Sequence, residues 1–112
     1  MISAQQAADY FIAFSHEHGD PLSNLKLQKL LYYAQAWHLA LRDEPLFPER
    51  IEAWVHGPVV PEVYRRYKEW AWQPITEDPP YPQVGPETLE HFNEIMDTYG
   101  MSTAYELERL TH

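Results

Sequence analysis

The chain has 112 residues, of which 45% are hydrophobic and 22% charged, a composition typical of one globular domain with a single core. Its formal net charge of -9 argues against direct binding of nucleic acid, because phosphate binding relies on lysine and arginine, and favours a neutral or basic protein partner. The absence of cysteine excludes a disulfide framework and a cysteine-based zinc site. Neither a signal peptide nor a membrane-spanning apolar run of about 18 residues is present, so we predict a cytoplasmic protein without membrane contact.

Two helices are predicted in the first 42 residues. Ser3 and Gln6 have the spacing of a capping box, and apolar residues then repeat at helical intervals up to residue 16. The stretch 25–42 contains neither glycine nor proline and is apolar most of the way round its helical circumference. We therefore expect a central buried helix at 25–42, around which the other elements pack.

The middle of the chain is predicted to contain a short extended segment followed by a third helix. Residues 51–55 alternate only partly and are too short to distinguish a strand from an extended loop. Gly57 and Pro58 predict a sharp turn, since glycine allows unusual backbone angles and proline excludes helix from the residue before it. Pro61 suits the first position of a helix, which should end near Trp72.

A proline-rich connection and two further helices complete the chain. Residues 73–86 cannot form a regular helix, and they are either a functional loop or a stiff wrap around the surface, with an extended piece at 74–77. Pro86 can begin a helix that Gly100 ends, and Ser102 is the expected cap of a fifth helix. The predicted fold is mainly α: a compact single-domain bundle of about five helices, with 51–55 and 74–77 as candidates for a short two-stranded β element.

Aromatic residues near the predicted turn are the candidates for partner binding. One interpretation of this region is structural: Trp54 fills the core between the second and third helices, while Gly57, Pro58 and Pro61 shape the turn. The functional interpretation is that tryptophan and tyrosine offer large contact areas to a partner at a low cost in rotamer entropy. The candidate partner-binding residues are Trp54, His56, Tyr64, Trp70 and Trp72.

Metal binding and catalysis have weak support. His16, His18 and Asp20 form an H-x-H-x-D pattern, and His38 and His56 could approach one another in space. A zinc site needs at least three ligands with supporting contacts, so we predict no metal and no cofactor. The sequence contains no nucleophile elbow, glycine-rich phosphate loop or helical H-E-x-x-H motif, and we predict no catalytic residue. A small metal-dependent enzyme remains the lesser alternative.

Four fragments in fixed order resemble the Panacea antitoxin family, also described as SocA/GepA-like. They are LKLQKLLYYAQAWHLAL from Leu25, PLF from Pro45, IEAWVHGPVVPEVY from Ile51 and ELERLTH from Glu106. The similarity covers nearly the whole chain, which implies one Panacea-like domain over 1–112. It also implies a helical antitoxin of a bacterial or phage toxin–antitoxin pair, which neutralises a cognate toxin from an adjacent gene by direct protein–protein binding. One described type instead acts as an adaptor that delivers the toxin to a protease, and this is the alternative.

The chain departs from the family pattern at both ends. Family members commonly continue past the Leu-Thr-His with a segment containing proline and tryptophan, so the resemblance implies a C-terminally truncated or minimal form. Many relatives also carry additional N-terminal domains, including DNA-binding ones, whereas here the first helix begins almost at Met1. We therefore expect no autoregulation of an operon by this chain alone.

Overall fold

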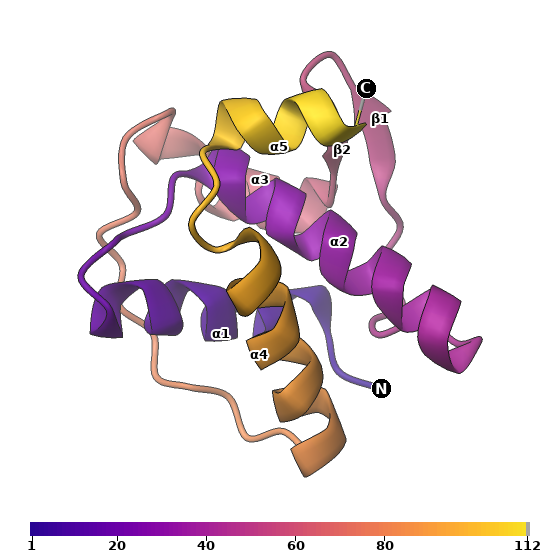
Figure 1. Cartoon of the computed structure of the whole chain (residues 1–112). Coiled ribbons are helices and arrows are strands. Elements are labelled where there is room, and N and C mark those ends of the chain that lie inside the picture. Colours follow the sequence, from indigo (N-terminus) through magenta and orange to yellow (C-terminus); the bar gives the residue numbers. More distant parts are fainter. Residues whose placement is uncertain (112) are drawn as a thin grey trace.

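Helix α2 runs through the middle of the molecule, and the other elements pack mainly around its first half (Figure 1). The fold is that of a computed structural model, which describes residues 1–111 apart from the side chains at positions 108 and 111. Within this part of the chain, a body of 33 × 30 × 24 Å holds five α-helices, one 3-10 helix and one antiparallel β-hairpin. The predicted mainly α fold is confirmed. The elements in chain order are α1 (Ala4–Glu17), α2 (Asn24–Arg42), β1 (Glu52–Trp54), β2 (Gly57–Val59), α3 (Pro61–Arg66), the 3-10 helix η1 (Lys68–Trp70), α4 (Pro86–Tyr99) and α5 (Ala104–Thr111).

The ends of the first two helices are set by local side-chain bonds. The Ser3 hydroxyl accepts the Gln6 N–H at 3.0 Å and the Gln6 side chain accepts the Ser3 N–H at 2.9 Å, which is the predicted capping box. Ser23 caps α2 by accepting the Lys26 N–H at 3.2 Å. Asp43 ends α2 in the left-handed conformation, with φ 58°.

The hydrophobic core lies where α1, α2 and α4 meet. Tyr10 and Phe11 of α1 pack against Phe92 of α4, with ring centroids 4.7 and 5.2 Å apart. Leu89, in the first turns of α4, is exposed and lines an open groove between α1 and α4. From α2, the core receives the side chains of Leu27, Leu30, Leu31 and Ala34.

The predicted central helix at 25–42 exists, but only its first part is enclosed. Trp37, Leu39 and Leu41, which the helical pattern predicts to be buried, are exposed. Figure 1 shows why: the C-terminal end of α2 projects beyond the helices that surround its first turns. The apolar circumference of this helix therefore indicates burial correctly for its beginning and wrongly for its end.

The third helix is shorter than predicted. Helix α3 ends at Arg66, six residues before the expected end near Trp72. The chain leaves the helical path at Tyr67, which has φ -107° and ψ 12° and whose ring is buried in the core. Burial of this ring ends the α-helix and leaves only the short η1 after it.

The β element forms within a hairpin instead of between two distant segments. Strand β1 pairs with β2 in an antiparallel register that places Trp54 opposite Gly57. The predicted partner at 74–77 does not pair with it, and Pro74 forms only an isolated bridge with Ser23. A two-residue loop brings β2 directly beside β1, whereas a proline at position 74 lacks the N–H that a ladder needs.

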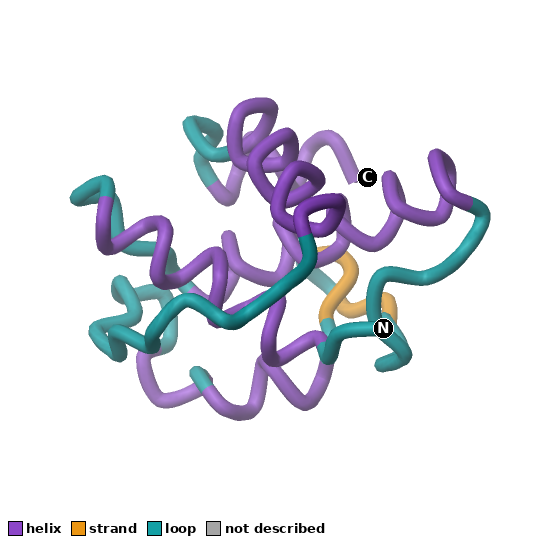
Figure 2. The backbone as a smooth tube through the Cα atoms, turned by 90° about the horizontal axis from the view of Figure 1, so that it is seen from below, coloured by secondary structure: helices purple, strands orange, loops and turns teal. Residues whose placement is uncertain are grey.

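The proline-rich connection lies along α1, as Figure 2 shows from below. The buried Ile75 donates its N–H to the Leu22 carbonyl at 2.8 Å, and His16 of α1 donates from Nε2 to the carbonyls of Ile75 and Glu77, each at 3.0 Å. These contacts correspond to the predicted stiff wrap.

The final helix begins one residue later than the sequence indicates. Thr103, and not the predicted Ser102, caps α5, because its hydroxyl accepts the Glu106 N–H at 3.1 Å and the Glu106 carboxylate accepts the Thr103 N–H at 2.8 Å. None of the helices within residues 1–111 is long and apolar enough to cross a membrane.

Candidate functional site

Buried polar side chains of α2 position the hairpin and α3. The Gln28 carbonyl oxygen accepts the Val60 N–H at 2.8 Å, and its amide donates to Asn24 at 2.9 Å. Asn24 in turn donates to the Tyr64 carbonyl at 3.0 Å. All of this bonding is buried or half-buried, where a missing partner costs most. The beginning of α2 therefore fixes where the aromatic residues of the hairpin and α3 lie.

The hairpin places Trp54, one of the predicted aromatic residues, directly before a two-residue loop. Its loop consists of Val55 and His56, and Gly57, with φ 114°, follows directly as the first residue of β2. The tight turn therefore precedes the Gly57-Pro58 pair that predicted it, and Gly57 supplies the positive φ that closes it. The His56 carbonyl accepts a hydrogen bond from the Lys29 ammonium, while the Val55 side chain at the tip is 85% exposed.

Trp54 and Tyr64 form an aromatic pair on this surface. Their ring centroids lie 4.9 Å apart with the planes at 69°, an edge-to-face geometry that is favourable for aromatic rings. Trp54 is 38% exposed and its indole N–H donates to Glu52 at 3.1 Å, so it does not fill the core. The structure thus brings two of the five predicted partner-binding residues into contact.

Trp70 and Trp72 differ in exposure. Trp70 is half-buried and donates its indole N–H to Thr76 at 3.0 Å, whereas Trp72 is 81% exposed. The turn between them is closed by a bond from the Gln73 N–H to the Trp70 carbonyl at 2.9 Å. Within this turn Ala71 has φ 52° and ψ -122°, a conformation that L-residues rarely adopt. A strained turn therefore displays Trp72 to solvent.

The five candidate residues do not form a single surface. The hairpin and the chain that follows η1 lie on opposite sides of α2 in Figure 1. Trp54, His56 and Tyr64 thus belong to one region and Trp72 to another, while Trp70 is largely occupied by contacts within the protein. Pro61 is buried and is the first residue of α3.

The sequence did not single out an exposed apolar surface at the end of α2. Trp37 is 46% exposed and its indole N–H donates to the Tyr99 hydroxyl of α4 at 2.8 Å. Leu41, one turn later, is 64% exposed. The only signal in the sequence was the apolar run itself, because a helix that is apolar all round exposes apolar residues wherever no other element covers it.

A pair of buried histidines joins α2 to α4. The rings of His38 and His91 lie 5.3 Å apart, and His91 donates from Nε2 to the Ala34 carbonyl at 2.8 Å. Burial lowers the pKa of His91, the positive charge of Arg42 and the nearness of His38 lower it further, and the Ala34 bond and Glu94 oppose this shift. His91 is therefore held in its neutral form by its surroundings.

Two further histidines, His16 and His18, also form hydrogen bonds with carbonyl groups. His16 contacts the connection through Nε2, and His18 donates from Nδ1 to the Phe14 carbonyl at 2.9 Å. In the part of the chain that the structure describes, no group of three or more histidine and acidic side chains is placed to hold a metal ion. The H-x-H-x-D pattern thus places both of its histidines in hydrogen bonds that stabilise the fold.

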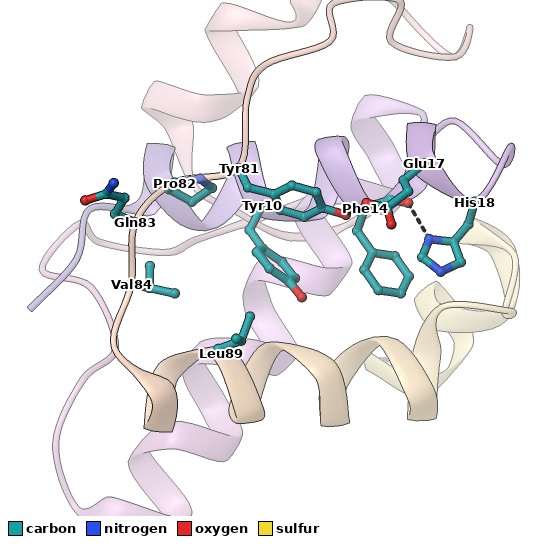
Figure 3. A pocket seen from close by; sticks show the side chains of 9 residues that line it. All are labelled: Tyr10, Phe14, Glu17, His18, Tyr81, Pro82, Gln83, Val84 and Leu89. Atoms are coloured by element: carbon teal, nitrogen blue, oxygen red, sulfur yellow. Dashed lines mark hydrogen bonds between the residues drawn. The ribbon is translucent and has the colours of Figure 1, made fainter.

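An open groove of 640 Å³ lies between the end of α1, the connection at 81–84 and the start of α4 (Figure 3). Its walls are largely aromatic: Tyr81 packs 5.2 Å from Tyr10, and Phe14 stacks 4.0 Å from His18. The Tyr81 hydroxyl donates to the Glu17 carboxylate, and burial together with this bond raises the pKa of Tyr81. The one carboxylate of this groove is thus already bound to a tyrosine, and the walls suit apolar contact better than acid–base chemistry.

Comparisons with known proteins identify the family to which the chain belongs. The family model described as "Antitoxin SocA-like, Panacea domain" matches residues 27–112, which include most of α2 and everything after it. The chain belongs to the Panacea family.

A curated relative agrees with this family assignment. Antitoxin SocA from Caulobacter vibrioides (strain NA1000 / CB15N) is 53% identical over 45 residues, which are 40% of this Panacea chain and 24% of the relative. The match therefore spans about a quarter of the relative's length. No solved structure matches the chain.

Proposed function

We propose that this Panacea domain is an antitoxin that neutralises a protein toxin by binding it directly in the cytoplasm. Family membership supports the antitoxin role. The observation that carries direct binding is that three tryptophans are exposed on a domain that has a well-packed hydrophobic core. These residues are Trp37, Trp54 and Trp72. Tryptophan is enriched among the residues that contribute most binding energy at interfaces.

The charge of the domain indicates the chemistry of the toxin. A net charge of -9 on 112 residues repels acidic partners and accelerates encounter with basic ones. Toxins that act on nucleic acids or nucleotides need a basic surface for phosphate. An acidic antitoxin that covers such a surface would block the toxin without any catalytic step.

Co-expression with the adjacent gene tests this function. The neighbouring open reading frame, expressed alone, should arrest growth, and expression together with this chain should restore it. The two purified proteins should then elute together as a complex of defined stoichiometry. A neighbour that is harmless alone, or one whose toxicity persists although both proteins are soluble and abundant, would refute the proposal.

The toxin level in the rescued cells separates masking from degradation. Under direct neutralisation the toxin should accumulate in the complex, and its half-life should be unchanged or longer than in cells that express it alone. A half-life that becomes shorter in the presence of this chain would contradict masking and would favour delivery of the toxin to a protease.

A further inference from the structure

The end of α2 and the outer side of α4 enclose a continuous groove. Two adjoining cavities, of 220 and 340 Å³, lie between these helices and share Leu41, His91 and Glu94 in their walls. On α4 the groove runs from Glu90 to Tyr99, which at about 1.5 Å per residue is roughly 14 Å, or two and a half helical turns.

The floor of this groove is apolar and fixed in place. Trp37 and Leu41 of α2 and Ile95 of α4 line it. Trp37 and Leu41 are exposed to solvent in the groove. Tyr99 supports Trp37 through the indole hydrogen bond and stacks on Tyr33 with centroids 4.0 Å apart and planes at 11°. Because these contacts hold the aromatic side chains in position before binding, a partner would lose little rotamer entropy of the floor.

The rim on α4 is a row of carboxylates. Glu90 and Glu94 line the groove, and Glu87 and Asp97 continue the row at spacings of three residues on either side. These spacings place all four along one side of the helix, and all four are exposed. Arg42 of α2 also lines the groove, and its charge is paired with Glu87 at 3.1 Å. Within the described residues, none of the other three carboxylates takes part in an ion pair.

This row is unfavourable for α4 taken alone. Glu90 and Glu94 are like charges one turn apart, and Asp97 lies in the last turn, where the helix dipole favours a cation and no basic residue is present. A cationic partner would relieve both effects. An acidic rim beside an apolar floor is also complementary to one type of ligand, a helix with apolar residues on one side and lysine or arginine beside them.

We propose that the α2–α4 groove is the docking site for a basic amphipathic helix of the toxin, an inference that rests on the proposed function. Apolar side chains one turn apart on that helix would contact Trp37 and Leu41, and its flanking cations would reach Glu90 and Glu94. A second copy of this chain is a poor occupant, because it would bring another acidic surface to the rim.

The surface can be tested without the toxin. The probe is an amphipathic leucine–lysine peptide of about 18 residues with apolar positions at helical spacing, and its control is a scrambled peptide of the same composition. In a ¹⁵N-HSQC titration of the full chain, the amphipathic peptide should shift the signals of residues 37, 41, 90–91 and 94–99. Shifts spread evenly over all acidic surfaces, or equal shifts with the scrambled peptide, would overturn the proposal.

Charge reversal on the rim provides the second test. The double variant Glu90→Lys/Glu94→Lys should weaken peptide binding by about tenfold or more, because it replaces two attractions by two repulsions. The matched control Glu69→Lys/Asp78→Lys makes the same change in net charge at exposed positions away from the groove and should bind like the wild type. Equal weakening in both variants would show a net-charge effect only and would overturn the site.

Rescue of growth in cells distinguishes the surface from the function. If the wild type relieves the toxicity of the neighbouring gene product and the rim variant does not, while the control variant does, both proposals are supported. Relief by the rim variant as well would overturn the groove and leave the antitoxin function standing. Self-association of the wild type that the rim variant abolishes would instead assign the groove to a second copy of this chain.

Discussion

Replacement of Ala71 by glycine is expected to stabilise the protein. Ala71 occupies φ 52° and ψ -122°, the first central position of a turn whose closing bond runs from the Gln73 N–H to the Trp70 carbonyl. Glycine adopts this conformation without a clash because it has no Cβ. The side chain of Ala71 is exposed, so its removal sacrifices no buried methyl group.

The size of the effect follows from two opposing contributions. A non-glycine residue in such a sparsely populated region costs about 1–3 kcal/mol in the folded state. Glycine gives the unfolded chain additional conformational entropy, which costs about 0.5–1 kcal/mol. The free energy of unfolding should therefore rise by up to roughly 2.5 kcal/mol, and for a domain of this size the melting temperature should rise by up to about 10 °C.

Urea denaturation with a matched helix variant measures this effect. Ala71→Gly should raise the urea midpoint without changing the slope, since the surface exposed on unfolding is the same. Ala36→Gly, in the interior of α2, has the same chemistry but should lower stability by about 1 kcal/mol, because its backbone is helical. If Ala71→Gly destabilised the protein as much as Ala36→Gly does, the turn at position 71 would not be strained and the explanation for the display of Trp72 would fail.

Three further substitutions and conditions have defined outcomes. The Tyr33 hydroxyl is buried and contacts no hydrogen-bond partner among the described residues, so Tyr33→Phe should keep or raise the melting temperature, and a fall of several degrees would contradict this. Gln28→Ala should lower the free energy of unfolding by at least about 2 kcal/mol in urea titration, because it leaves the buried Val60 N–H without an acceptor. Burial lowers the pKa of His91 below its unfolded value of about 6.5, so the unfolded chain takes up a proton at this residue more readily than the folded protein does. The free energy of unfolding therefore decreases as the pH falls below about 6.5. The urea midpoint should thus fall between pH 7.5 and 5.5, and should fall less in His91→Gln.

The elements that could be predicted from the sequence are those with local causes. Ser3 with Gln6 defines the start of α1 through bonds between neighbours in the chain, and Pro86 begins α4 because a first helical position needs no N–H. The unbroken run at 25–42 required only helical spacing and the absence of glycine and proline. Each of these signals lies within one continuous segment of the chain, so no knowledge of the tertiary fold was needed.

The features that could not be predicted depend on contacts between distant residues. The α-helix of the third segment ends where Tyr67 enters the core and its hydroxyl accepts a bond from Gln5, 62 positions away in the sequence. The exposure of Trp37 and Leu41 depends on how far α4 extends along α2. A periodic pattern shows that residues share a side of a helix, but it carries no information on whether another element covers that side.

Helix α2 buries polar residues at its beginning and exposes apolar residues at its end, and the exposed end favours binding as its purpose. At its beginning, Asn24, Gln28 and Lys29 are buried, where they donate to or accept from backbone groups of the hairpin and α3. At its end, Trp37 and Leu41 are exposed. Stability alone explains the polar residues, since they satisfy backbone groups that would otherwise be unpaired. It does not explain apolar side chains left in water, which lower solubility unless a partner covers them. One continuous helix thus anchors the aromatic hairpin at one end and offers an apolar surface with an acidic rim at the other.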